Sequence, residues 1–287
     1  MKERIISGIG IVAVMLIIVW SGGIVTCLGM GAISIIGYLE LTKALKCRKE
    51  EKICLLEIIG VVSTVGYYFL LFLTDYKPSF MYLFIYLIGF FGVQMMIYVF
   101  NFPRYDSSQV INSFFSFVYC PVMLSFIVVT RALTGDNVDT FFIPGFWAVW
   151  DIFILAWGSD TMAYFSGVLL GKHKAFPKLS PKKTVEGCLG GILGAAVFNY
   201  LYALILMKNN LITSSETFYF IVLGAIGALL GQIGDLAASA IKRNNDIKDY
   251  GNLIPGHGGI MDRFDSIVLI SPIVYVVVLN LFSNIIK

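Results

Sequence analysis

Long apolar runs dominate the chain and predict an all-α, polytopic integral membrane protein with about nine transmembrane helices. A helix that crosses the hydrocarbon core needs about 17–25 mostly apolar residues, and nearly the whole sequence divides into runs of that length. The predicted spans are 5–20, 22–40, 54–74, 79–100, 111–130, 141–170, 187–207, 217–241 and 266–286. The run at 141–170 is longer than one crossing requires, so we expect it to be broken or bent.

Positive charge is distributed unevenly among the loops that this division produces. Of the 21 Lys and Arg residues, 17 fall at the N-terminus or in alternate loops, and only four fall on the other side. Cytoplasmic loops of membrane proteins carry the excess of Lys and Arg. The N-terminus and the two long basic loops, 171–186 and 242–265, are therefore predicted to be cytoplasmic.

Composition agrees with a membrane protein and excludes several other classes. Hydrophobic residues make up 58% of the chain and charged residues 14%, whereas soluble domains carry about 25% charged residues. The net charge of +3 leaves no basic footprint for nucleic acid, so no nucleic-acid partner is expected. The five cysteines are scattered and contain no C-x-x-C pair, which argues against a zinc site or a disulfide framework.

Polar functional groups gather in the second half of the chain. Residues 1–150 carry almost none inside the predicted spans, and we interpret them as a scaffold of lipid-facing helices that could also supply a dimer surface. Residues 151–287 are predicted to form the catalytic region, with its functional groups at the cytoplasmic ends of the helices.

The first polar cluster is Asp160, inside the predicted span 141–170. An acid in a membrane helix is costly and marks a functional site by default. Tyr164, four residues later, lies on the same helix face. Asp151 is a second acid in this run, and it would lie at the membrane interface if the span began later than drawn.

The second cluster lies in the basic loop before the seventh span. Its sequence is Ser180-Pro181-Lys182-Lys183-Thr184, followed by Glu186 and Gly187. Ser180 is predicted to cap a helix that begins at Pro181. A helix start that carries two lysines and a hydroxyl is a good anion site. The alternative is a basic loop attracted to anionic lipid, which explains the lysines but not the Ser-Pro and Thr residues among them.

The third cluster surrounds the end of the eighth span. Asp235, Ser239 and Lys242 are spaced four and three residues apart, so one helix face carries an acid, a hydroxyl and a base. The polar residues that follow are Arg243, Lys248, Asp249, His257, Gly258, Gly259, Asp262, Arg263 and Asp265. Carboxylates hold Mg²⁺ together with substrate phosphates, basic side chains neutralise phosphate, and glycines let backbone amides approach it. The cluster therefore predicts a site for a metal–nucleoside triphosphate, although His257 could equally make a structural hydrogen bond in a tight turn.

Glycines recur along one face of the same span. Gly224, Gly227, Gly231 and Gly234 follow helical spacing, and small residues let membrane helices pack closely. We interpret this stripe as a packing surface that holds Asp235 in place.

These motifs resemble those of phosphatidate cytidylyltransferases (CDP-diacylglycerol synthases). The resemblance covers residues 157–266, with family-like spacing. It is carried by Asp160 with Ala163-Tyr164, by the run 180–187, and by Ser239-x-x-Lys242-Arg243 through Lys248-Asp249 and His257-Gly258-Gly259 to Asp262-Arg263 and Asp265. Val185 departs from the pattern, because many members carry an aromatic residue there.

The resemblance implies a helical membrane enzyme that uses CTP and phosphatidic acid, depends on Mg²⁺ and a possible second cation, and forms a homodimer in the cell membrane. Asp235 and Asp262 would be the metal ligands, and the active site would face the cytoplasm. The expected catalytic residues are Asp235, Asp262, Lys242, Arg243 and Arg263. The expected substrate-binding residues are Ser180, Lys182, Lys183, Thr184, Ser239, Asp160, Lys248, Asp249, His257, Gly258, Gly259 and Asp265.

Two other functions fit parts of the pattern. A CTP-dependent lipid kinase of the polyprenol type would share the membrane, the nucleotide and the metal, but it should need a base for the acceptor hydroxyl. A transporter should show ionisable pairs in the middle of its spans, and the clusters here lie at span ends.

Overall fold

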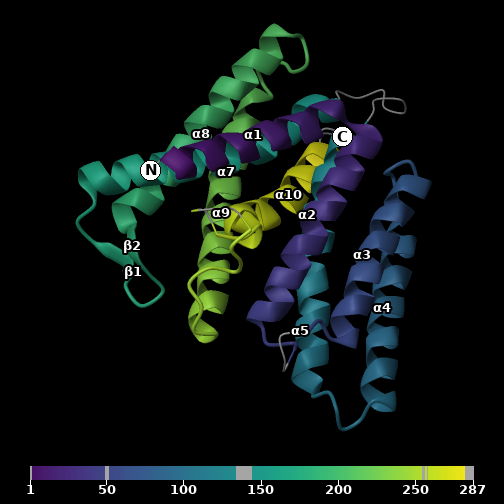
Figure 1. Ribbon diagram of the computed structural model, residues 1–287. Coiled ribbons are helices and arrows are strands. Elements are labelled where there is room, and N and C mark those ends of the chain that lie inside the picture. Colours follow the sequence, from purple (N-terminus) through teal and green to yellow (C-terminus); the bar gives the residue numbers. More distant parts are fainter. Residues whose placement is uncertain (1, 49–51, 134–143, 254–255, 257, 282–287) are drawn as a thin grey trace. The chain divides into compact units, whose positions relative to one another are not determined.

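The computed structural model describes residues 2–48, 52–133, 144–253, 256 and 258–281, and these residues are predominantly helical (Figure 1). The helices are α1 (Lys2–Ser21), α2 (Gly23–Ala44), α3 (Leu55–Leu73), α4 (Phe80–Phe100), α5 (Ser107–Phe117), the π-helical turn η1 (Val118–Val122), α6 (Met123–Arg131), α7 (Gly145–Leu170), α8 (Val185–Lys208), α9 (Thr217–Asn244) and α10 (Met261–Leu281). The strands are β1 (Lys174–Phe176) and β2 (Ser180–Thr184). Since α5, η1 and α6 follow one another without a break, each of the nine predicted spans coincides with a helix over its described residues, which confirms the fold class. Residues 141–143 and 282–286 of two of these spans lie outside the described residues.

Seven of the described helices are long and apolar enough to cross a membrane. They are Gly23–Ala44, Leu55–Leu73, Phe80–Phe100, Ser107–Arg131, Gly145–Leu170, Val185–Lys208 and Thr217–Asn244. The apolar part of α1, Gly10–Ser21, is shorter. The chain is therefore an integral membrane protein.

The helix expected to be broken or bent is not broken. The run 141–170 contains a single helix of 26 residues, Gly145–Leu170, and its bending stays a prediction. The irregular helix is the one at 107–131, where the π-helical turn contains Pro121. Proline has no backbone N–H to donate within a helix, and the wider turn accommodates that loss.

The chain forms two compact units, and each unit is made of two separate stretches of sequence. One, here called the first unit, consists of Met1–Ala132 and Ile241–Phe264, and the second unit consists of Leu133–Ala240 and Asp265–Lys287. The boundaries fall inside α9 and α10, so each of these helices contributes residues to both units.

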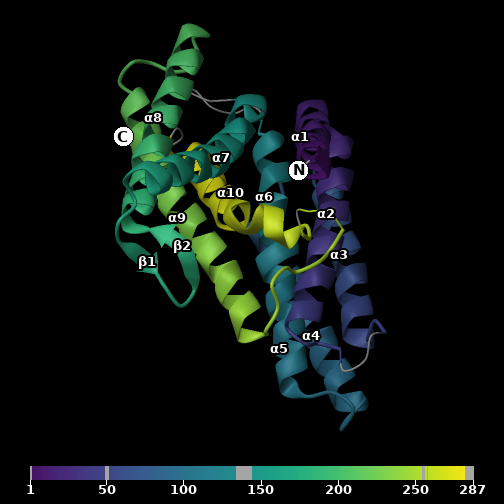
Figure 2. The same cartoon turned by 60° about the vertical axis from the view of Figure 1, so that its left-hand side comes forward.

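The first unit is built around α2. This helix packs against α3, α5 and α6, and the bundle is visible in the purple-to-teal part of the chain in Figure 2. Buried hydroxyl groups join its helices, since Tyr38 and Ser113 lie 2.8 Å apart and Ser34 and Tyr68 lie 2.7 Å apart. Such hydrogen bonds satisfy polar groups that lipid could not.

The second unit is built on the pair α7–α8, and the glycine face of α9 packs into it. Gly224 lies against the backbone of Ala195 and Ala196 in α8, and Gly227 lies against Leu155 in α7. The other two glycines of the stripe, Gly231 and Gly234, lie against residues of α10. This confirms the packing role predicted for the stripe. Asp151 is buried within the unit.

We expect Gly224→Ala to destabilise the protein by about 1–3 kcal/mol, because over-packing a close contact forces the neighbouring backbone to move. A methyl group there would lie 2.7 Å from Cα of Ala196 and 3.0 Å from the carbonyl oxygen of Ala195. The matched control is Gly89→Ala in α4, where a methyl group meets nothing within 4 Å. The melting temperature in detergent should fall for Gly224→Ala and should stay the same or rise for Gly89→Ala. Equal melting temperatures for the two variants would contradict close packing at Gly224.

Candidate functional site

A short β-hairpin connects α7 to α8 in the second unit. Strands β1 and β2 pair antiparallel, with Lys174 opposite Thr184 and Phe176 opposite Ser180. The carboxylate of Glu186, in the first turn of α8, accepts hydrogen bonds from the backbone amides of Lys172 and His173 at 3.1–3.3 Å. The hairpin is thereby tied back to the start of α8.

The predicted helix start at Pro181 is wrong. Residues 180–184 are extended in β2, and α8 begins at Val185, where Thr184 caps it by accepting from the amide of Gly187 at 3.1 Å. The strand pairing keeps the segment extended, and Pro181 is tolerated because a two-stranded sheet has only edge strands. Ser180 therefore does not cap a helix, and Thr184 does.

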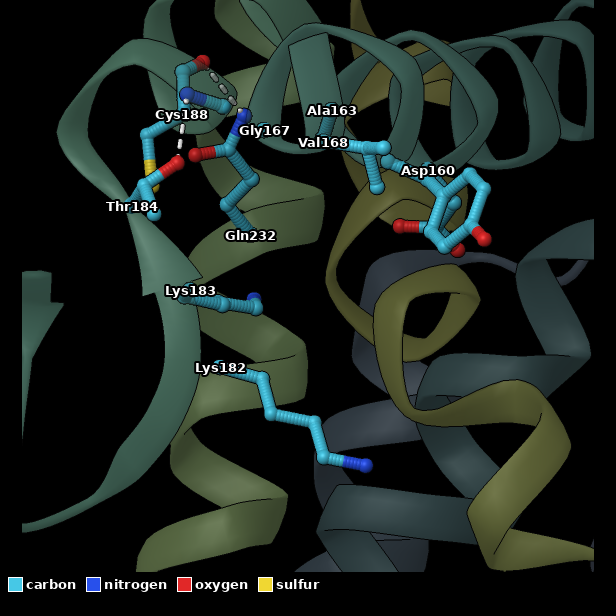
Figure 3. A pocket seen from close by; sticks show the side chains of 11 residues that line it. Asp160, Ala163, Gly167, Val168, Lys182, Lys183, Thr184, Cys188 and Gln232 are labelled. Carbon is cyan, nitrogen blue, oxygen red and sulfur yellow. Dashed lines mark hydrogen bonds between the residues drawn. The ribbon is translucent and has the colours of Figure 1, made fainter. Parts of the chain in front are cut away.

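A cavity of about 380 Å³ opens between α7, β2, α8 and α9 within the second unit. It is lined by Asp160, Ala163, Tyr164, Gly167, Val168, Lys182, Lys183, Thr184, Gly187, Cys188 and Gln232. Figure 3 shows Lys182 extending from β2 toward the side of the pocket on which Asp160 lies. The first two sequence clusters thus meet in one pocket, and Asp160 and Tyr164 line it together as their spacing predicted.

An ion pair joins this pocket to α9. The Nζ atom of Lys183 lies 2.6 Å from Oδ2 of Asp235, and the two side chains are 24% and 29% exposed. Partial exposure leaves both groups accessible to a charged ligand. Ser239 follows one turn later on α9, as predicted.

Four pocket residues were not identified from the sequence: Gly167, Val168, Cys188 and Gln232. The side-chain amide of Gln232 donates to the carbonyl of Cys188 at 3.0 Å and so fixes α9 against α8 (Figure 3). Gln232 lies three residues before Asp235, so its helical spacing could have placed it on the same face. Cys188 gives no such signal in the sequence.

A second polar cluster lies in the first unit, around Asp262 at the start of α10. Its Oδ1 atom accepts from Nζ of Lys242 at 2.7 Å, and its Oδ2 atom accepts from the backbone amides of Tyr250 and Gly259 at 2.8 Å and 3.0 Å. The side chain of Asp262 is only 4% exposed. Lys242 also lies over the ring of Tyr250, 5.3 Å from its centroid. Asp262 therefore ties residues 242, 250 and 259 to the start of α10.

The remaining predicted site residues fall into the same two units. In the first unit, Arg243, Lys248, Asp249 and Arg263 are exposed, and Gly258 adopts φ +82°, a conformation that favours glycine. In the second unit, Asp265 accepts from the adjacent amide of Ser266 at 2.8 Å. His257 lies outside the described residues. The catalytic and binding roles of all these residues stay predictions.

The two carboxylates expected to bind Mg²⁺, Asp235 and Asp262, differ in how well their surroundings suit a metal ligand. Among the described residues no group of three or more His, Cys, Asp or Glu side chains forms a metal site. Mg²⁺ needs only one or two carboxylates when substrate phosphates and water complete its shell, so this does not oppose it. Asp235 fits, since it is partly exposed and its described ion pair uses one oxygen; Asp262 fits only if Lys242 moves away from Oδ1.

Fold and pocket together define a polytopic membrane protein with a pocket that combines two lysines, the carboxylate of Asp160 and apolar helix faces, a set suited to phosphorylated amphiphiles. The chain belongs to the cytidylyltransferase family, whose model matches residues 2–281.

Several curated proteins named phosphatidate cytidylyltransferase are similar to the chain. The Bacillus subtilis protein is 43% identical over 130 residues, which is 45% of this chain and 46% of that protein. The Thermotoga maritima protein is 32% identical over 60% of this chain and 62% of its own length. The chain thus spans about half to three fifths of these two relatives in alignment. The Haemophilus influenzae protein is 27% identical over 95% of this chain and 96% of its own length.

Proposed function

We propose that the protein transfers CMP from CTP to phosphatidic acid, giving CDP-diacylglycerol and pyrophosphate for phospholipid synthesis. Membership of the cytidylyltransferase family supports the nucleotide, and the names of the relatives support the lipid. The structural observation that carries the proposal is the pocket of the second unit. Lys182, Lys183 and Asp160 adjoin Tyr164 and Val168 in this pocket, and the last two are exposed on an apolar helix. An amphiphile with a phosphate head group needs such a combination.

In the proposed reaction, an oxygen of the phosphatidate phosphate attacks the α-phosphorus of CTP. The new P–O bond forms as the bond to the β-phosphate breaks, and pyrophosphate leaves. The nucleophile is already anionic near neutral pH, so the protein need not supply a general base. The task left to the protein is to align two anions and to offset their charge.

Basic side chains of this chain would carry out that task. Lys182 and Lys183 would hold phosphate in the pocket, and Lys183 would exchange its contact with Asp235 for one with substrate. Lys242, Arg243 and Arg263 would bind the triphosphate of CTP. The basic side chains would be oriented by Asp160, Asp249 and Asp265. Asp235 and Asp262 would ligate Mg²⁺, which when bound neutralises phosphate charge and stabilises the leaving group. A second cation could join the same carboxylates.

The proposal also includes a topology and an assembly. The excess of Lys and Arg in the N-terminus and in the loops 171–186 and 242–265 supports an active site on the cytoplasmic face of the cell membrane. A homodimer formed through the helices of residues 1–150 is proposed from the resemblance to the family.

A label-transfer assay tests the reaction. Purified protein in detergent receives Mg²⁺, phosphatidic acid, and CTP labelled at either the α- or the γ-phosphate. We expect α-label in the lipid and γ-label in pyrophosphate. Transfer of γ-label to a polyprenol-type alcohol would instead make the protein a CTP-dependent lipid kinase. Absence of transfer from either position by folded protein would favour the transporter.

Alkylation of Cys188 should report occupancy of the pocket. Cys27, Cys47 and Cys120 are buried, whereas Cys188 and Cys54 are partly exposed, so in a Cys54→Ser background Cys188 is the thiol expected to react with N-ethylmaleimide. Because Cys188 lines the pocket, phosphatidic acid with CTP and Mg²⁺ should slow its alkylation by about tenfold, as expected for a site mostly occupied by ligand. Mass spectrometry of the labelled peptide measures the rate, with diacylglycerol as the control lipid. Equal rates with both lipids would place the substrate elsewhere.

A further inference from the structure

The carboxylate of Glu40, near the end of α2, lies against the start of α10 within the first unit. Its Oε2 atom accepts a hydrogen bond from the backbone amide of Met261 at 2.9 Å, across 221 positions of sequence. Glu40 is only 9% exposed. Met261 is the first residue of α10, and the first amides of a helix have no partner inside that helix. Glu40, on another helix, therefore accepts a hydrogen bond from an amide that has no partner within α10. The helix dipole also favours a negative charge at this position.

Two glycines of the segment between α9 and α10 also surround this carboxylate. A methyl group at Gly251 or at Gly259 would overlap the side chain of Glu40. One turn earlier in α2, a methyl group at Gly37 would lie 3.4 Å from Sδ of Met261. The segment thus approaches α2 at three points, Gly251, Gly259 and Met261, and all three adjoin Glu40.

Glu40 and Asp262 both contact residues 250–251 and 259–261. Asp262 accepts from the amides of Tyr250 and Gly259, and Glu40 adjoins the neighbouring residues Gly251 and Met261. Asp262 has Lys242 as its counter-charge, whereas Glu40 is held by the backbone amides of Ile260 and Met261. A buried carboxyl group held in this way fixes those amides, because displacing them leaves buried polar groups unsatisfied.

We propose that Glu40 is a positioning residue for CMP transfer, holding residues 250–251 and 259–261 in the arrangement that the reaction requires. This inference rests on the proposed function, which assigns Lys242, Asp262 and Arg263 to phosphate and metal. Glu40 itself touches neither substrate nor metal in this assignment. It acts by setting the backbone at both described ends of the segment, 250–251 and 259–261.

The test compares Glu40→Ala with Glu57→Ala, a matched control in the same unit. Glu57 is also a buried acid near a helix start, since it accepts from the amide of Cys54 at 3.0 Å and pairs with Arg48 at 3.1 Å. It makes no described contact with the segment between α9 and α10. Both variants should lower the melting temperature. Only Glu40→Ala should lower kcat, by about 10²-fold as a displacement of about 1 Å can, with KM for phosphatidic acid little changed. Glu40→Gln, which keeps an acceptor oxygen, should recover part of kcat.

A second measurement does not depend on activity. Amide hydrogen exchange in peptides containing Tyr250 or Met261 should rise at least about tenfold in Glu40→Ala, as loss of a charged hydrogen bond allows, and stay unchanged in Glu57→Ala. If the wild type transfers no α-label while this exchange difference appears, the proposed function fails and the positioning of the segment stands. If the wild type is active and Glu40→Ala keeps its kcat, or Glu57→Ala loses as much, the inference is overturned.

Contact between Glu40 and Gly259 in the active protein can be tested by a double-mutant cycle. Gly259→Ala should reduce kcat by about tenfold or more in the wild type, where the added methyl group would collide with the carboxylate. In the Glu40→Asp background, whose shorter side chain makes room, the same substitution should cost less. Strictly additive losses would contradict the contact.

Discussion

Asp235→Asn is expected to reduce kcat/KM for CMP transfer by about 10²–10³-fold, the loss that follows removal of one strong electrostatic contact to a transition state. The substitution keeps the shape of the side chain and removes the charge proposed to hold Mg²⁺ beside the triphosphate. The fold should survive, because the pair between Asp235 and Lys183 is partly exposed and such pairs contribute about 1 kcal/mol or less. The value of kcat/KM for CTP is measured by α-label transfer at saturating phosphatidic acid, and thermal unfolding in detergent checks that the variant is folded.

Metal dependence distinguishes this role from a structural one. Any activity left in Asp235→Asn should require more Mg²⁺ than the wild type does, since the affinity for the ion falls. Asp75→Asn, an exposed acid that follows α3, is the matched control and should leave both activity and Mg²⁺ dependence unchanged. Near wild-type turnover in purified Asp235→Asn would remove Asp235 from the metal site.

Asp262→Ala should have the largest effect on stability, a loss of about 3–5 kcal/mol, because it leaves a mostly buried cation without its counter-charge. It would strand Lys242 and deprive the amides of Tyr250 and Gly259 of their acceptor. Activity should disappear with it. Thermal unfolding in detergent measures the loss, and Asp249→Ala, an exposed acid of the same segment, should shift stability by no more than about 0.5 kcal/mol.

A compensating change separates stability from catalysis at this position. In the double variant Asp262→Asn with Lys242→Met no unpaired charge remains, so stability should return close to the wild-type value. CMP transfer should stay low, since both groups are assigned to the reaction. Recovery of activity together with stability would show that Asp262 and Lys242 serve the fold alone.

The helices could be predicted from the sequence because span length and apolar composition act locally. Each predicted span coincides with a helix, and the glycine stripe of α9 packs as its spacing indicated. Asp160 meets Lys182 and Lys183 in one pocket. This agrees with the sequence, because the predicted topology places all three polar clusters at the cytoplasmic ends of the spans.

Contacts across long stretches of sequence could not be predicted in the same way. Residues 180–184 carry a serine, a proline and two lysines, which favour a helix start locally, and only pairing with 174–176 makes them a strand. Glu40 lies four residues before the end of α2 and has the pattern of an ordinary interfacial acid. Its role depends on Met261, whose position no local signal reveals.

The contact between Glu40 and Met261 also constrains how the protein is made. A ribosome adds about 5–20 residues per second, so Met261 follows Glu40 by about 11–44 s of synthesis. During that interval α2 is already available for insertion while the backbone that satisfies its carboxylate does not yet exist. Because Glu40 lies within about one turn of the end of α2, it can stay hydrated at the membrane surface until α10 arrives. The first unit therefore closes late in translation, after residues 133–240 of the second unit have been synthesised. A nascent chain that stops before residue 261 cannot complete the first unit.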